Sequence, residues 1–125
     1  MAIRLVLVDD QPAVRQGLRM RLSLEPDILI VGEAGDGESS LALVDGLRPD
    51  VVLMDIMMPR MDGIAATKAL RQAVPECAVV ILSLHDDLVT RQRARAAGAF
   101  ACIAKQELDK LLLEAIRQAA HMERA

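Results

Sequence analysis

Aromatic residues are almost missing from this chain of 125 residues: Phe100 is the only one, and Trp and Tyr are absent. Hydrophobic residues still make up 53% of the sequence, so a core has to be built mainly from Leu, Val, Ile, Ala and Met. A chain of this length can form one compact domain that buries about two-thirds of the surface of its unfolded form.

Long apolar runs are missing as well. No run approaches the roughly 20 residues that span a bilayer. Arg4 interrupts the first apolar stretch and Asp9-Asp10 ends it, which does not fit a signal peptide. Cys77 and Cys102 lack CxxC spacing and fit small buried residues of a reducing compartment. We therefore expect a cytoplasmic protein without membrane association.

The chain has no large excess of either charge. Fifteen basic and 18 acidic residues give a net charge of −3. Binding to nucleic acid relies on neutralising phosphates with basic side chains. The composition therefore predicts that this domain does not bind nucleic acid by itself.

Short apolar runs alternate with segments of helical periodicity along the whole sequence. The runs predict strands at Ile3–Val8, Ile28–Val31, Val51–Met54, Ala78–Leu82 and Phe100–Ala104. The first helix begins at Asp10 or Gln11 as cap, with Pro12 in its first turn. Later helices are predicted from the turn at 35–37, from Asp62-Gly63, from about Asp87 to Ala97, and from Glu107 to about Met122.

Five strands alternating with five helices predict an α/β fold, a doubly wound parallel sheet covered on both faces. No internal repeat or linker divides the sequence, so we expect a single domain over residues 1–125. The carboxyl ends of parallel strands open on one edge of the sheet, where ligands bind. Polar residues stand at these ends: Asp9, Asp10, Asp55, Ser83 and Lys105.

Each of these residues has an ordinary explanation when taken alone, as a turn carboxylate, a helix cap, a strand-end hydroxyl or a solvated lysine. Taken together, these residue types indicate a binding site. Neighbouring carboxylates repel one another, so a fold that collects them generally needs a cation, and oxygen ligands suit Mg²⁺. A hydroxyl and an ammonium can hold phosphoryl oxygens. The set therefore predicts a metal site that accepts a phosphoryl group.

With these residues placed, the chain resembles the receiver domain of bacterial two-component response regulators over nearly its whole length. The matching motifs are Leu-Val-Asp-Asp at 7–10, Met-Asp-Ile-Met-Met-Pro-Arg-Met-Asp-Gly at 54–63, Leu-Ser at 82–83, and Lys105 after the last predicted strand. The resemblance implies the flavodoxin-like strand order 2-1-3-4-5. Residues 31–37 and 93–99 look most like the LuxR/NarL type, whose receivers precede a helix-turn-helix output domain.

The resemblance also implies a role for each site residue. Asp55 would be the phosphoacceptor, taking a phosphoryl group from a sensor histidine kinase. Asp10 and Asp55 would ligate Mg²⁺ directly, Asp9 would act through water, and the backbone carbonyl of Met57 would complete the protein ligands. Ser83 and Lys105 would hold phosphoryl oxygens. Such a domain is a signalling module, not an enzyme that turns over a substrate.

Phosphorylation is expected to draw Ser83 and the loop Leu84-His85-Asp86 towards Asp55 and so to change the surface of the fourth helix, fifth strand and fifth helix. The family usually has Tyr or Phe three residues before the lysine, where this chain has Cys102. Period-2 alternation predicts that Phe100 lies on the same strand face as Cys102, so both are candidate switch residues. His85, two residues after Ser83, is either a loop residue at the rim of the site or a general base.

Several alternatives remain open at this stage. The chain is either a receiver cut from a longer transcription regulator, which its subfamily resemblance favours, or a stand-alone phosphorelay shuttle. It could form a homodimer on phosphorylation, through an undetermined combination of the first, fourth and fifth helices. A Mg²⁺-dependent phosphohydrolase of the haloacid-dehalogenase type would need Asp-x-Asp after its first strand, whereas in this chain Asp9 and Asp10 are adjacent. A flavin carrier would need a Ser/Thr/Gly-rich phosphate loop and aromatic residues.

Overall fold

The computed structural model describes residues 2–84 and 87–124. Within them, five parallel strands form one sheet in the order β2-β1-β3-β4-β5. The strands are β1 (Ile3–Val8), β2 (Ile28–Ala34), β3 (Val51–Asp55), β4 (Ala78–Ser83) and β5 (Ala101–Ala104). The fold class and strand order expected from the sequence are confirmed.

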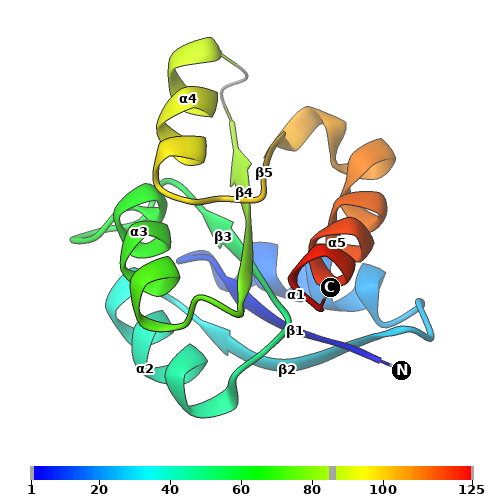
Figure 1. Cartoon of the computed structure of the whole chain (residues 1–125). Coiled ribbons are helices and arrows are strands. Elements are labelled where there is room, and N and C mark those ends of the chain that lie inside the picture. Colours follow the sequence, from blue (N-terminus) through cyan, green and yellow to red (C-terminus); the bar gives the residue numbers. More distant parts are fainter. Residues whose placement is uncertain (1, 85–86, 125) are drawn as a thin grey trace.

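The helices cover both faces of this sheet. They are α1 (Pro12–Leu22), α2 (Gly37–Leu47), α3 (Gly63–Ala73), α4 (Leu88–Ala96) and α5 (Leu108–Arg124), with a 3₁₀ turn η1 (Lys105–Glu107) between β5 and α5. Helices α1 and α5 lie on one face, and α2, α3 and α4 lie on the other (Figure 1). None of the helices in the described part of the chain is both long and apolar enough to cross a membrane.

Capping residues explain where these helices begin. Gln11 is the N-cap of α1, and Pro12 occupies its first turn, where a missing N–H costs nothing. At α2, α3 and α4 an aspartate carboxylate accepts a hydrogen bond from a backbone N–H three residues on. The pairs are Asp36 with Ser39, Asp62 with Ala65, and Asp87 with Thr90.

Alternation along the strands divides the core into two layers. Leu5, Leu53 and Leu82 pack on the side of α1 and α5, with Leu18, Leu22, Leu112 and Ile116. Val6, Met54 and Ile81 pack on the side of α2, α3 and α4, with Val44, Leu70 and Ala94. Because both faces are covered, β1, β3 and β4 are apolar nearly throughout.

Two sequence-based expectations differ from the structure. Strand β2 continues past Val31 to Ala34, because Gly32 and Glu33 pair with Val6 and Leu7 after an irregularity in the ladder. As an edge strand it tolerates a polar residue such as Glu33.

The other difference concerns Phe100 and Cys102, which do not share a face. Phe100 packs against the core layer of α1 and α5, whereas Cys102 packs against the opposite layer. The expected alternation fails because β5 begins only at Ala101. Phe100 precedes the ladder, and its N–H donates to the carbonyl of Val79 (2.8 Å).

Candidate functional site

The register of the sheet brings the predicted polar residues to one edge. Val8 pairs with Met54, so Asp9, which follows β1, and Asp55, which ends β3, stand side by side. Ser83 ends β4 opposite Ala104, and Lys105 follows directly. All of these residues therefore lie at the carboxyl ends of β1, β3, β4 and β5.

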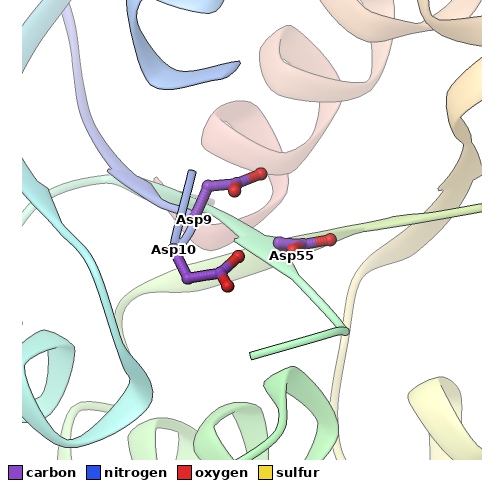
Figure 2. A group of neighbouring side chains, drawn as sticks. All are labelled: Asp9, Asp10 and Asp55. Carbon is purple, nitrogen blue, oxygen red and sulfur yellow. The ribbon is translucent and has the colours of Figure 1, made fainter. Parts of the chain in front are cut away.

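Three carboxylates form the centre of this edge. Asp9, Asp10 and Asp55 each offer one oxygen, and these oxygens lie within 4.8 Å of one another. Figure 2 shows the three carboxyl groups gathered where β1 and β3 end. Asp9 and Asp55 are 2% and 4% exposed, whereas Asp10 is exposed, so the cluster is open to solvent from the side of Asp10.

Lys105 is the cation of the cluster. Its Nζ lies 3.1 Å from Oδ1 of Asp55 and 4.0 Å from Oδ2 of Asp9. Among these four groups, three carboxylates and one ammonium leave an excess of negative charge. Burial raises the pKa of the Asp9 carboxyl above its usual value; the Gln11 N–H opposes this shift, and the Asp55 carboxylate adds to it.

The donor set fits a divalent cation. Oδ1 of Asp9 accepts a hydrogen bond from the N–H of Gln11 (2.9 Å), but its buried Oδ2 has no hydrogen-bond partner among the described residues. A buried oxygen without such a partner is costly and calls for an explanation. Three carboxylate oxygens with excess negative charge, one of them exposed, match the hard oxygen ligands of Mg²⁺. Asp9, Asp10 and Asp55 are the residues that would hold it.

The loop after β3 borders the carboxylates. A hollow of about 530 Å³ is lined by Asp10 and Asp62 together with Ile56, Met57, Met58 and Pro59. Met57 exposes its side chain, and Met58 is buried in the core layer of α2, α3 and α4. The role of the Met57 carbonyl as a metal ligand stays a prediction.

Ser83 approaches this edge from the other side of the sheet. It is 3% exposed, and alternation from Ile81 places it on the face covered by α2, α3 and α4, the face against which Cys102 packs. Asp55, one residue after Met54, alternates to the opposite face. His85 and Asp86, part of the predicted switch loop, lie outside the described residues.

Two further residues, Gly63 and Arg15, support the site through tertiary contacts that the sequence did not predict. Gly63 packs directly against the end of β3, and its N–H donates to the carbonyl of Ile56 (2.8 Å). Arg15 of α1 donates to the backbone carbonyl of Asp9 and to Glu33 of β2. Nothing in the sequence separates Arg15 from Arg19, because the distinction depends on tertiary contacts.

Comparison with known proteins shows the family of this chain. Residues 5–117 match the family described as "Response regulator receiver domain". The chain is 42% identical over 121 residues to the uncharacterized transcriptional regulatory protein YxjL of Bacillus subtilis, covering 97% of this chain and 56% of that protein. It is 44% identical over 104 residues to protein-glutamate methylesterase/protein-glutamine glutaminase 3 of Anaeromyxobacter dehalogenans, covering 82% of this chain and 30% of that protein.

A solved structure agrees as well. The crystal structure of a LuxR-family two-component response regulator from Aurantimonas sp. superposes with a TM-score of 0.93 at 31% identity, covering 98% of this chain and 87% of that one. The chain thus belongs to the receiver-domain family of two-component response regulators. It spans about half the length of the regulators YxjL and DegU, 56% and 50% respectively.

Proposed function

We propose that Asp55 is the phosphoacceptor of this receiver domain and that a sensor histidine kinase supplies the phosphoryl group. The observation that carries the proposal is the setting of Asp55. Its carboxylate is buried at the end of a central strand, 3.1 Å from the Lys105 ammonium and beside two further carboxylates. Asp55 ends the central strand β3, and its carboxylate lies closer to the Lys105 ammonium than that of Asp9, which is 4.0 Å away.

In the proposed step, a carboxylate oxygen of Asp55 attacks the phosphorus of a phosphohistidine on the kinase. A P–O bond forms, the P–N bond breaks, and the electron pair of that bond returns to the imidazole nitrogen. The product is an acyl phosphate on Asp55. This step transfers one group to the protein itself, so the domain accepts a signal and does not turn over a small substrate.

The remaining residues have supporting roles. Mg²⁺, held by Asp9, Asp10, Asp55 and the carbonyl of Met57, would offset the negative charge that the carboxylates and the phosphoryl oxygens share. The Lys105 ammonium, 3.1 Å from Oδ1 of Asp55, would hold one phosphoryl oxygen, and the Ser83 hydroxyl would donate to another. The exposure of Asp10 leaves the site accessible to a docking kinase.

The signal would leave the site through Ser83. Movement of its hydroxyl towards the new phosphoryl group would displace the end of β4 and bias the surface of α4, β5 and α5. Ser83 and Cys102 alternate to the same face of the sheet, so Cys102 is the better placed of the two candidate switch residues. Phe100 packs on the opposite face and would respond only indirectly.

We further propose that the receiver controls a DNA-binding output domain in the cytoplasm and can form a homodimer on phosphorylation. The similarity to YxjL and to LuxR-family regulators supports a transcriptional output. The similarity to a protein-glutamate methylesterase covers 30% of that protein, so similar receivers occur in proteins with other activities.

Acetyl phosphate with Mg²⁺ tests the central claim. The protein should gain a single phosphoryl group by intact mass, labile to hydroxylamine as an acyl phosphate is. Asp55→Asn should gain none. Asp45→Asn is the matched control, because Asp45 is exposed in the last turn of α2, at the opposite edge of the sheet from Asp55, and should label like the parent.

Two results would contradict the proposal. Labelling of Asp55→Asn at the parental rate would place the acceptor elsewhere. Release of many equivalents of inorganic phosphate per protein, without a stable labelled form, would favour the phosphohydrolase instead.

A further inference from the structure

The backbone of Asp9 is fixed on both sides of the residue. Its N–H donates to the carbonyl of Ala34 (3.1 Å), and its own carbonyl accepts a hydrogen bond from Nη1 of Arg15. The carbonyl of Asp9 belongs to the same planar peptide unit as the N–H of Asp10. A donor that fixes this carbonyl therefore fixes the plane from which the Asp10 side chain departs.

Arg15 is itself held in place. Its Nε donates to Oε1 of Glu33 (3.2 Å) while Nη1 reaches Asp9, so one guanidinium uses two of its donors in different directions. Glu33 also accepts from Arg19 through its other oxygen. A planar guanidinium with several donors can bridge two acceptors in this way, and a lysine ammonium on its flexible stem cannot reproduce that geometry.

Arg15 and Arg19 differ although both contact Glu33. The side chain of Arg15 is 20% exposed and extends to the backbone carbonyl of Asp9. The side chain of Arg19 is 48% exposed and forms a salt bridge with Glu33. No contact of Arg19 with Asp9 or Asp10 is found among the described residues. The two arginines therefore form a matched pair: both contact Glu33, but only Arg15 also bonds the backbone carbonyl of Asp9 among the described residues.

We infer that Arg15 is a positioning residue for the metal site: its hydrogen bond to the Asp9 carbonyl presets the Asp9-Asp10 peptide so that both carboxylates face the cation. This inference rests on the proposed Mg²⁺ site. The effect is geometric and opposes simple electrostatics, because a nearby positive charge by itself would weaken cation binding.

The opposition between geometry and charge makes the inference testable. Mg²⁺ affinity is measured by calorimetry on the folded protein for Arg15→Lys and Arg15→Gln, with Arg19→Lys and Arg19→Gln as matched controls. Arg15→Lys keeps the charge and should weaken Mg²⁺ binding by about tenfold, the size expected for losing an outer hydrogen bond at a metal site. Arg15→Gln should also weaken it, and the Arg19 variants should stay within about twofold of the parent.

A second readout separates positioning from general stability. In metal-free protein the amide resonances of Asp10 and Gln11 should move in Arg15→Lys and stay in place in Arg19→Lys. With acetyl phosphate, the Mg²⁺ concentration for half-maximal labelling should rise in Arg15→Lys, while the rate at saturating Mg²⁺ stays near that of the parent. A loss of stability alone would not produce this split.

Three results would overturn the inference: Mg²⁺ affinity of Arg15→Lys within twofold of the parent, tighter Mg²⁺ binding by Arg15→Gln, or equal weakening in the Arg19 controls. If the Arg15 variants fail to fold, Glu33→Ala removes the second anchor of the guanidinium. It should weaken Mg²⁺ binding severalfold, and unchanged affinity would overturn the inference. If the parent protein binds no Mg²⁺, the proposed function is contradicted as well. If the parent binds Mg²⁺ and one of these three results is found, only the inference about Arg15 is overturned.

Discussion

Gly63 packs against the backbone of Asp55 so closely that no side chain can be added there. A Cβ on Gly63 would press on the carbonyl oxygen of Asp55 and lie 2.8 Å from its carbonyl carbon and from Cα of Ile56. These are backbone atoms at the end of a central strand, so they cannot move aside as the end of a flexible side chain would. The first residue of α3 thus sets the position of the proposed phosphoacceptor.

Gly63→Ala should therefore displace the end of β3. We expect a loss of about 3 kcal/mol in the free energy of unfolding, the cost of overpacking a well-packed site, together with slower labelling by acetyl phosphate. Gly17→Ala is the matched control, because a Cβ on Gly17 meets nothing within 4 Å in an exposed helix interior. It should stabilise the protein by about 0.5–1 kcal/mol. Denaturant titration of both variants measures the difference, and equal effects would contradict this account.

Asp9→Asn should stabilise the metal-free protein. Burial holds the pKa of Asp9 above its usual value, so folding favours the protonated carboxyl. The stability that Asp9 contributes is complete below its unfolded pKa, roughly pH 4, and is lost as pH rises through the higher folded value. Asparagine carries no such charge. The variant should therefore melt above the parent in EDTA at pH 7, and the gap should narrow towards pH 4.

The same variant should lose most of the stabilisation that Mg²⁺ gives the parent, because ligand binding stabilises only the form that binds it. Thermal unfolding with and without Mg²⁺ checks this. A gap between parent and variant that is independent of pH, or an unchanged response to Mg²⁺, would count against the charged cluster described here.

Lys105→Met should separate metal binding from phosphoryl transfer. Its loss removes the cation 3.1 Å from Oδ1 of Asp55, so Mg²⁺ should bind as tightly as in the parent or more tightly. Labelling by acetyl phosphate should slow by about 100-fold, the usual effect of removing one donor that stabilises developing negative charge. Lys110→Met, at an exposed position of α5, is the control and should behave like the parent. Equal weakening of both functions would mean that Lys105 only supports the local structure.

Most of the site residues could be predicted from the sequence because they stand at the carboxyl ends of predicted strands. The gathering of Asp9, Asp10 and Asp55 follows from parallel topology alone, because every such strand presents its carboxyl end to the same edge. Capping residues such as Asp62 are also local properties of the sequence. The expected helix starts therefore agree with the structure to within a residue or two.

Features that depend on contacts between distant segments escaped prediction. The extension of β2 through Glu33 depends on pairing with β1, and the role of Arg15 depends on where that strand places Glu33. Alternation along the predicted fifth strand placed Phe100 on the same face as Cys102. In the structure Phe100 packs on the opposite face, because the β5 ladder begins one residue later, at Ala101. Neither local propensity nor periodicity contains this information.

Helix α4 should open more readily than the other helices, because Ala94 is its only buried residue among those described. Asp87 caps it by accepting hydrogen bonds from the backbone and hydroxyl of Thr90 (2.7 and 3.1 Å). Asp36 caps α2 in the same way through Ser39, but α2 also buries Ser40 and Val44. Asp87→Ala and Asp36→Ala should each lower the global stability by about 1 kcal/mol.

Hydrogen exchange distinguishes the two caps. If α4 opens locally, only Asp87→Ala changes the free energy of that opening, and the α4 amides should exchange about fivefold faster. Asp36→Ala should leave their exchange unchanged, because α2 stays folded while α4 opens. Faster α4 exchange in both variants would mean that α4 opens only with the whole domain. In that case the surface of α4 could not shift by itself, and the proposed route from Ser83 to that surface would require a concerted change of the sheet.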